Sequence, residues 1–278
     1  KQKTAYEIRL SLVGSEMCIR DRGGYITFPA GMMGVLLGKP LILHEQNSVA
    51  GMANRVLAGV ADRVFTAFPG VLGKAHWVGN PLRRSFLGQP EPAQRFAKRS
   101  GTLRLLVLGG SLGARVLNET VPRALAVLAP AQRPLVTHQG GAGQIAALQQ
   151  AYAAAGVQAQ LTPFIDDTAA ALADADLVIC RAGASTVTEL AALGVAALLV
   201  PLPSAVDDHQ TGNARFLVDQ GAAWLMPQSE LTPDGLARFL QQTDRAALLA
   251  RADRARGLAR TGAVQEIVAA CEELVAGT

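Results

Sequence analysis

Short apolar runs alternate with amphipathic helical patterns along the chain after residue 101. The apolar runs have the length of strands, and turn-forming residues bound them. The predicted strands are Leu103–Leu108, Pro134–His138, Val157–Leu161, Asp176–Cys180, Ala196–Val200 and Ala222–Leu225. The helices predicted between them are Ala114–Leu128, Gln144–Ala155, Asp167–Ala173, Thr186–Leu193 and Gln210–Asp219. Such alternation predicts right-handed βαβ units, and the near-continuous apolar strands indicate a parallel sheet that is buried on both faces.

The part of the chain before residue 85 shows the same alternation on a smaller scale. Its predicted strands are Pro40–His44, Arg63–Ala67 and Ala75–Val78, and its predicted helices are Pro29–Leu37 and Ala50–Val60. Residues 85–101 are polar and rich in proline, as is typical of a linker, and Arg251–Gly277 has the pattern of a terminal helical segment. The expected fold is therefore α/β. A complete doubly wound, Rossmann-like domain at 102–278, terminal helices included, follows the latter part of another Rossmann-like domain at 23–84.

Residues 1–22 differ in texture from everything that follows. The segment has no initiating methionine, and it resembles the translated adapter sequence found at the ends of reading frames from fragmentary assemblies. We interpret it as non-native and leave it out of the fold prediction; a disordered native arm is the alternative. This interpretation implies that the chain is a fragment whose true start is missing.

Composition narrows the classes of function. Hydrophobic residues make up 50% of the chain and charged residues 17%, which excludes a fully disordered protein. The net charge of +4 is small for 278 residues and no long basic run occurs, so nucleic acid is a poor candidate partner. The distant cysteines predict neither a disulfide framework nor a zinc site and favour a reducing cytoplasm. No apolar run approaches the roughly 20 residues of a membrane-spanning helix.

The loops after the predicted strands hold the candidate chemistry, because the strand-to-helix loops of a parallel sheet converge at its carboxyl edge. Gly109–Arg115 is rich in glycine and opens a helix, so its backbone N–H groups can cradle a phosphate; a tight turn is an equally good interpretation. A dinucleotide fold also needs a carboxylate at the end of its second strand. Residues 137–140 (THQG) contain none, which argues against a nicotinamide cofactor.

A second loop, Arg181–Glu189, combines small residues with hydroxyls at a helix start, which favours capping and anion binding. Glu189 would lie one turn inside the helix, where a carboxylate can accept both hydroxyls of a ribose. The alternative is a capping box, with Thr186 as the N-cap and Glu189 three positions on. For this motif taken alone, the capping box is the better interpretation.

Two further loops carry polar groups. In Thr162–Asp167 the backbone of Ile165 can read the edge of a base, and Asp166 can start the next helix. In Asp207–Asn213 two carboxylates and His209 suggest a metal site, but adjacent residues of one loop do not generally converge on one ion, so we predict no metal. Amide and imidazole groups that contact a sugar explain this loop better.

The region before the linker also contains candidates. Residues 44–47 (HEQN) follow an apolar strand, and because burial of such polar groups is costly we expect them to face a cleft. Arg83 can reach a diphosphate, and a solvated arginine is the alternative. His44 is predicted to be structural, and His76 and His138 are predicted to be ordinary surface or strand-end histidines.

These motifs occur together in the order and spacing of one family: Gly23-Gly24-Tyr25, HEQN at 44–47, VGNPLR at 78–83, GGSLGAR at 109–115, FIDD at 164–167, RAGASTVTE at 181–189 and HQTGNA at 209–214. From Gly23 onward the chain resembles the MurG family of peptidoglycan glycosyltransferases, which have a two-domain GT-B fold. The resemblance implies inverting transfer of N-acetylglucosamine from UDP-N-acetylglucosamine to undecaprenyl-pyrophosphoryl-N-acetylmuramoyl-pentapeptide, at the cytoplasmic face of the bacterial cell membrane. It implies no cofactor and no metal.

The resemblance also implies donor-binding roles for matching residues. Asn47 would contact the donor from the first domain, and Arg83 and Ser111 would hold the diphosphate. Ile165 would bind uracil through its backbone. The loop around the nucleotide would consist of Ala184, Ser185, Thr186, Val187, Thr188 and Glu189, with Glu189 on the ribose. Gln210 and His209 would bind the sugar; relatives often have an amide at the position of His209, which leaves the division of labour open.

The proposed base of the family is a histidine in a glycine-rich N-terminal segment that nothing in this sequence matches. We therefore expect negligible turnover from these 278 residues alone. A second hypothesis is a nucleotide-sugar-binding module without turnover, and a third is a related GT-B transferase that uses UDP-glucose or UDP-galactose on glycolipids. Apolar Phe28–Leu37 with Lys39 is a candidate membrane contact, which a buried helix explains equally well.

Overall fold

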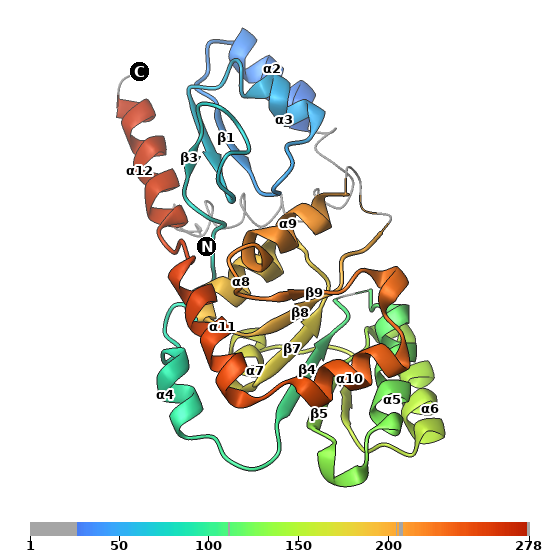
Figure 1. The fold of residues 1–278 in the computed structure, drawn as a ribbon. Helices are drawn as coiled ribbons and strands as arrows, with labels where there is room; N and C mark the ends of the chain where they lie inside the picture. Colours follow the sequence, from blue (N-terminus) through green and yellow to red (C-terminus); the bar gives the residue numbers. More distant parts are fainter. Residues whose placement is uncertain (1–26, 111, 204, 206–207, 277–278) are drawn as a thin grey trace, which may run out of the picture. The chain divides into compact units, whose positions relative to one another are not determined.

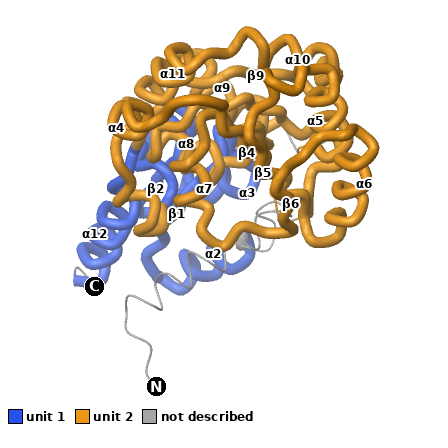
Figure 2. Tube along the Cα trace, turned by 90° about the horizontal axis from the view of Figure 1, so that it is seen from below, with its two compact units in different colours: residues 1–81, 260–278 blue, residues 82–259 orange. Residues whose placement is uncertain are grey.

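The computed structural model describes residues 27–110, 112–203, 205 and 208–276 of the chain. These residues form two compact units (Figure 2). Of the described residues, unit 1 holds those up to Pro81 and those from Arg260 on, and unit 2 holds those between Leu82 and Ala259. Each unit has a parallel sheet of its own, so the α/β class and the Rossmann-like organisation expected from the sequence are confirmed.

The sheet of unit 2 is parallel throughout and has the strand order β6-β5-β4-β7-β8-β9 (Figure 1). The strands are β4 (Arg104–Leu108), β5 (Leu135–Gln139), β6 (Gln160–Thr162), β7 (Leu177–Cys180), β8 (Ala197–Leu199) and β9 (Trp224–Leu225). The chain runs outward from β4 to β6, crosses back to β7 and continues to β9. The order therefore reverses between β4 and β7, which is the switch point of a doubly wound fold.

Helices pack against the sheet of unit 2 in two groups. The first group is α5 (Arg115–Val127), α6 (Ile145–Ala155) and α10 (Pro233–Gln242). The second group is α4 (Pro92–Ala97), α7 (Thr168–Asp174), α8 (Ala184–Leu193), α9 (His209–Val218) and α11 (Arg245–Gly257). Leu117, Leu148 and Leu190 of these helices are fully buried with Val107 and Ile179 of the strands. Burial of apolar area on both faces of the sheet is the main stabilising contribution.

The predicted linker at 85–101 is part of unit 2. It contains a short 3-10 turn (Arg84–Phe86) and α4, and the side chains of Phe86 and Phe96 are buried. Helix α10 was absent from the sequence prediction. Thr232 caps α10 by accepting a hydrogen bond from the backbone N–H of Gly235, and Pro233 occupies its first turn, both of which are helix-start signals.

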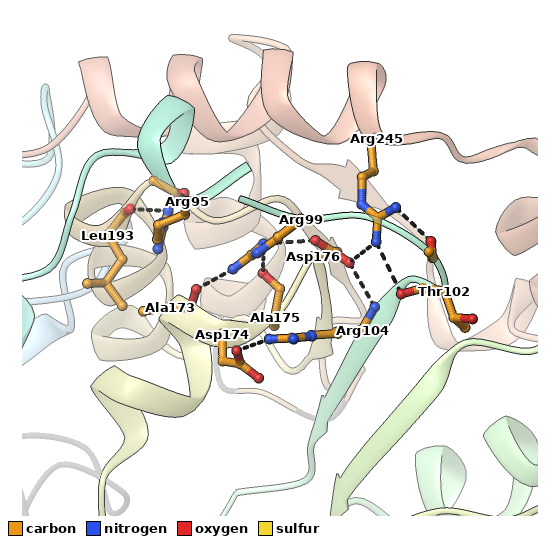
Figure 3. Close-up of polar contacts among 12 residues, drawn as sticks. Arg95, Arg99, Thr102, Arg104, Ala173, Asp174, Ala175, Asp176, Leu193 and Arg245 are labelled. Atoms are coloured by element: carbon orange, nitrogen blue, oxygen red, sulfur yellow. Dashed lines mark hydrogen bonds and ion pairs between the residues drawn. The ribbon is translucent and has the colours of Figure 1, made fainter. Parts of the chain in front are cut away.

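A buried carboxylate joins the amino-terminal edge of this sheet to the segments around it (Figure 3). Asp176, just before β7, has no exposed surface. Its Oδ1 accepts a hydrogen bond from Arg99 Nη1 at 2.8 Å, and its Oδ2 accepts from the backbone N–H of Arg104 at 2.8 Å and from Arg245 Nη2 at 3.2 Å. Arg99 also donates to carbonyl groups at the carboxyl end of α7. The single charge of Asp176, just before β7, thus binds the end of the predicted linker, the start of β4 and the start of α11.

Unit 1 contains a smaller parallel sheet in the order β1-β2-β3. Its strands are β1 (Ile42–Glu45), β2 (Arg63–Thr66) and β3 (His76–Trp77), and its helices are α2 (Thr27–Leu36), α3 (Met52–Leu57) and α12 (Ala263–Ala276). Leu43, Leu57 and Val64 form one apolar cluster with α2 and α3. Phe65 and Val78 form another with α12.

The structure divides the chain differently from the prediction at its carboxyl end. All terminal helices were expected in the domain at 102–278, whereas α12 belongs to unit 1. The physical reason is that Ala263, Ile267 and Ala270 pack against Phe65 and Val78 of unit 1. In the part of the chain that is described, no helix is long and apolar enough to cross a membrane.

The Asp176 interactions predict a large effect on stability. Asp176→Asn removes the buried charge that faces Arg99 and Arg245, and we expect the free energy of unfolding to fall by about 3–5 kcal/mol. The measurement is urea unfolding followed by circular dichroism. Asp174→Asn is the matched control, because Asp174 forms an exposed ion pair with Arg104 and exposed pairs contribute little. Equal losses in the two variants would contradict the role given to Asp176.

Candidate functional site

The carboxyl edge of the unit 2 sheet collects the loops that the sequence analysis selected. The glycine-rich loop 109–114 follows β4, and the loop 181–183 follows β7, so the two flank the switch point. Loop 162–167 follows β6, and α9 begins after the loop that follows β8. In open α/β sheets, ligands bind at this edge beside the switch point.

Backbone packing determines the shape of the glycine-rich loop. Gly113 has φ of 76°, and a Cβ on it would lie 2.2 Å from the carbonyl oxygen of Gly140. A Cβ on Gly141 would lie 2.5 Å from the backbone nitrogen of Gly113. The loops after β4 and β5 therefore touch main chain to main chain, which requires glycine at both positions. The loop is a tight turn, and this does not exclude a phosphate cradle. Helix α5 starts directly after the turn and no side chain caps it, so its first backbone N–H groups can face a phosphate. Ser111 lies outside the described residues.

The position at which α8 starts contradicts the capping-box interpretation. The N-cap is Gly183, and Thr186 is already inside the helix, so Thr186 does not cap it. Glu189 therefore does not form a capping box with Thr186. Its side chain is 19% exposed, and Arg83 Nη2 lies 3.8 Å from its Oε1. Burial raises the pKa of Glu189 to about 7, and the nearby Arg83 charge lowers it in part.

The other residues of this loop divide into two groups. Ser185 and Thr186 are partly exposed in the first turn of α8. The side chains of Ala184, Val187 and Thr188 are buried, and Thr188 Oγ1 donates to the carbonyl oxygens at 184 and 185. The side chains of Val187 and Thr188 therefore pack into unit 2, and only the main-chain groups of these residues can contact a ligand.

Loop 162–167 has an internal hydrogen bond and a helix cap. Thr162 Oγ1 donates to the carbonyl oxygen of Phe164 at 2.6 Å. Asp167 is the N-cap of α7 and accepts from Ala170 N at 3.0 Å, close to the start of the predicted helix Asp167–Ala173; Asp166 does not cap the helix. Ile165 is partly buried between these two anchors.

Gln210 ties α9 to two neighbouring loops. Its Oε1 accepts from the backbone N–H of Leu202 at 3.0 Å and of Ala182 at 3.3 Å. Asn213, one turn on, is buried and donates to the carbonyl oxygen of Ala182. His209, the first residue of α9, is partly exposed. The oxygen of Gln210 is thus committed to protein, which leaves its NH₂ group as the part that can reach a sugar.

Among the residues that the structure describes, no group of three His, Cys, Asp or Glu side chains could hold a metal ion. Asp207 lies outside the described residues. Asp208 has φ of 49° and accepts from Thr211 Oγ1 at 2.7 Å, so it acts as a local turn residue. The geometry of this loop is that of a helix start.

In unit 1 the HEQN motif differs from its prediction. Glu45 is 3% exposed, and Gln46 is also buried. Glu45 Oε1 accepts from the backbone N–H groups of Gln46 and Asn47 at 2.7 and 2.9 Å, and its Oε2 accepts from Asn54 Nδ2 at 2.7 Å. Three hydrogen bonds offset the cost of burying the Glu45 carboxylate, so Glu45 needs no cleft, whereas Gln46 Oε1 is buried without a hydrogen-bond partner among the described residues. Asn47 is partly buried in this unit.

The histidines other than His209 have different roles. His44 Nε2 lies 2.9 Å from the carbonyl oxygen of Gly79, which agrees with the structural role predicted. His76 is exposed at the start of β3. His138 is neither a surface nor a simple strand-end residue: it is fully buried, 3.0 Å from Tyr152 Oη and 3.1 Å from Asn118 Oδ1. Burial lowers the pKa of His138 to about 3, so it stays neutral and structural.

Polar residues without a predicted role organise the loops from within. Arg181 donates to the carbonyl oxygens of Val200 and Pro201 and to Gln228 Oε1. Gln139 and Asn118 are buried and bind the glycine-rich region. The available signal was their type: long polar side chains at strand ends or on an otherwise buried helix face must find partners.

Two family models match the chain. Glycosyltransferase family 28 C-terminal domain matches residues 104–267, and Glycosyltransferase family 28 N-terminal domain matches residues 12–66. The second range begins inside segment 1–22, so the interpretation of that segment as non-native stays a prediction.

Curated relatives agree with these matches. A protein from Polaromonas sp. (strain JS666) is named UDP-N-acetylglucosamine--N-acetylmuramyl-(pentapeptide) pyrophosphoryl-undecaprenol N-acetylglucosamine transferase. It is 70% identical over 91% of this chain and 65% of its own length. A protein of the same name from Verminephrobacter eiseniae is 66% identical over 91% of this chain and 72% of its own length.

Solved structures lead to the same fold. The crystal structure of Acinetobacter baumannii MurG superposes with a TM-score of 0.82 at 43% identity, over 90% of this chain and 72% of that one. Glycosyltransferase VinC in complex with dTDP shares the fold, with a TM-score of 0.51 at 21% identity over 77% of this chain and 55% of that one. This chain spans 65% of the length of its relatives from Polaromonas sp. (strain JS666) and Albidiferax ferrireducens. The N-terminal model matches residues of unit 1, and the C-terminal model matches mainly residues of unit 2. The chain belongs to glycosyltransferase family 28.

Proposed function

We propose that this chain carries the donor site of an inverting glycosyltransferase. The donor is UDP-N-acetylglucosamine, and the acceptor is undecaprenyl-pyrophosphoryl-N-acetylmuramoyl-pentapeptide. The observation that carries the proposal is the half-buried carboxylate of Glu189, set beside Arg83 at the switch point of unit 2. The names of relatives at 60–70% identity support the choice of donor and acceptor.

Glu189 is suited to bind the ribose. A carboxylate in a half-buried site can accept both hydroxyls of a sugar, and the low local dielectric strengthens these bonds. Arg83 now faces this carboxylate from 3.8 Å, and its guanidinium lies 5.1 Å from the centre of the Phe86 ring. When the ribose hydroxyls bind the Glu189 carboxylate in place of Arg83, the Arg83 guanidinium becomes available to the diphosphate.

The glycine-rich loop and the helix starts are suited to the diphosphate. The first turns of α5 and α8 lack side-chain caps, so their backbone N–H groups can donate to phosphate oxygens. Their positive dipole ends and Arg83 would stabilise UDP as it leaves, without a metal ion. The residues of loop 162–167 would contact the base, with the main chain of Ile165 as the candidate reader.

The reaction is a direct displacement. A bond forms between the acceptor oxygen and the anomeric carbon as the bond from that carbon to the β-phosphate oxygen breaks. The electron pair of the broken bond leaves with UDP, and a general base takes the proton of the acceptor hydroxyl. We assign this base to none of the described residues, and we expect little turnover from this chain alone. The related proposal, a nucleotide-sugar-binding module, describes the same site without the acceptor step.

A lipid-linked acceptor places the reaction at the cytoplasmic face of the membrane, and unit 1 offers a suitable surface. Helices α2 and α3 pack against each other and expose Met33 (52%), Leu36 (73%), Leu37 (68%), Met52 (82%) and Val56 (49%). Exposed apolar groups of this size mark interaction surfaces. Lys39 and Arg55 add positive charge that anionic lipids attract.

Loss of the Glu189 carboxylate should weaken donor binding. We expect this chain to bind UDP-N-acetylglucosamine saturably, and Glu189→Ala to reduce the binding free energy by at least ~1 kcal/mol through loss of charged hydrogen bonds. Isothermal titration calorimetry measures this difference. Glu230→Ala, at an exposed position of unit 2, is the control and should bind as the unchanged chain does. A folded sample with no donor binding would contradict the proposed function.

The raised pKa of Glu189 predicts opposite pH trends for binding and stability. Donor affinity should rise between about pH 6 and pH 8, as the carboxylate ionises. The folded chain holds this proton up to about pH 7 and the unfolded chain only up to its usual 4.5, so the contribution of Glu189 to stability falls as the pH rises through that window. Glu189→Gln should therefore raise the free energy of unfolding at pH 8 by about 1–3 kcal/mol while it weakens binding.

Urea unfolding at pH 8 and at pH 4 checks the stability part, since the advantage of Glu189→Gln should vanish at the lower pH. Calorimetry across the same range checks the binding part. A variant that is no more stable than the unchanged chain at pH 8 would show that burial does not penalise this carboxylate.

The exposed face of α2 and α3 should contribute to membrane binding. Leu36→Asp places a charge on this face, and we expect the fraction bound to vesicles of phosphatidylethanolamine and phosphatidylglycerol to fall about threefold. Co-sedimentation measures the bound fraction. Leu135→Asp is the control, because Leu135 is also exposed but lies on β5 in unit 2. Equal losses in the two variants would speak against a membrane face on α2 and α3.

A further inference from the structure

The side chain of Gln139 extends the pairing of β4 and β5 beyond the last residue of the ladder. Gln139 ends β5, where it pairs with Leu108, and its carbonyl oxygen accepts from Gly109 N at 3.0 Å. The next residue, Gly110, is held by the side-chain amide of Gln139. Gly110 N donates to Oε1 at 3.0 Å, and Nε2 donates to the carbonyl oxygen of Gly110 at 2.9 Å. The amide thus replaces the main chain of a partner strand.

The same amide also reaches a second loop. Gln139 Nε2 donates to the carbonyl oxygen of Pro163 at 3.0 Å, in the loop after β6. Strands β4 and β6 are not neighbours, because β5 lies between them. One side chain, 4% exposed, therefore joins the glycine-rich loop to the loop that contains Ile165. It uses both of its protons and its oxygen to do so.

A separate set of contacts holds the other side of the glycine-rich loop. Gln144 Nε2 donates to the carbonyl oxygen of Leu112 at 2.8 Å, and Asn118 Nδ2 donates to Gln144 Oε1 and to the carbonyl oxygen of Gly140, each at 3.0 Å. These contacts shape the loop locally. The contacts of Gln139 do something different, because they connect this loop to the one after β6.

We propose that Gln139 is a positioning residue that sets the separation between these two loops, so that one nucleoside diphosphate can contact both at once. This inference rests on the proposed function, in which the glycine-rich loop holds the diphosphate and the loop with Ile165 holds the base. Gln139 itself is buried beneath the loops and touches no reacting atom. Its effect is on ligands that span the two loops, and ligands that occupy only one are insensitive to it.

A comparison of two ligands tests this role. Uridine should occupy the base loop alone, whereas UDP should occupy both loops. Gln139→Met keeps the size of the side chain and removes its three hydrogen bonds to Gly110 and Pro163. We expect it to weaken UDP binding about tenfold and to leave uridine binding within about twofold, measured on this chain by calorimetry and ligand-observed NMR.

Two further variants sharpen the test. Gln139→Glu keeps the acceptor for Gly110 N but places an oxygen against the carbonyl oxygens of Gly110 and Pro163, so it should show the same selective loss. Gln158→Met is the matched control at an exposed position of unit 2, and it should bind both ligands as the unchanged chain does. Circular dichroism and urea midpoints establish that each variant is folded.

The outcomes separate the inference from the function on which it rests. Selective loss of UDP binding in both Gln139 variants supports the positioning role. Unchanged UDP binding in folded variants overturns it and leaves the proposed function standing, as do parallel losses for uridine and UDP, which would indicate a general structural role. Failure of the unchanged chain to bind either ligand overturns the proposed function and the inference with it.

Discussion

The buried carboxylate of Asp176 is the interaction on which the architecture of unit 2 depends. It binds the main chain at the start of β4 and the guanidinium groups of Arg99 and Arg245, so segments far apart in the sequence share one charge. A buried charge is tolerable only when its partners are in place, which makes the arrangement all-or-none. These contacts lie at the amino-terminal edge of the sheet, opposite the loops of the candidate site.

The two edges use different chemistry. Ion pairs hold the amino-terminal edge, whereas neutral amides hold the carboxyl edge: Gln139, Gln144 and Gln210 each bind main-chain groups of the loops. Amides both donate and accept, so they can satisfy main-chain groups that have lost their strand partners without adding a charge beside the site. Arg181, directly after β7, does add a charge at this edge, but it donates to the carbonyl oxygens of Val200 and Pro201 and to Gln228. Glu189 and Arg83 instead face each other at 3.8 Å. Burial raises the pKa of Glu189, because the charged carboxylate loses hydration there.

Close packing of main chain gives the site its precision. The turns at Gly113 and Gly141 approach each other so closely that a single Cβ would displace one of them. The glycine-rich loop therefore has little freedom to relax around a wrong ligand. Preorganised donors lose little conformational freedom when a ligand binds, and this agrees with the proposed role of the loop.

Local pattern in the sequence determined the elements: the apolar runs became the strands of both parallel sheets, and glycine-rich or hydroxyl-rich loops at strand ends predicted where a ligand would bind. The same local view could not place α12 with Phe65 and Val78, and it could not show that His138 is satisfied in burial by Tyr152 and Asn118. It also favoured a capping box at Thr186, where the helix starts at Ala184. Tertiary structure alone decided these points, because a buried polar group is identified by partners that are distant in sequence, and the pKa of Glu189 and the contacts of Gln139 exist only once those partners meet.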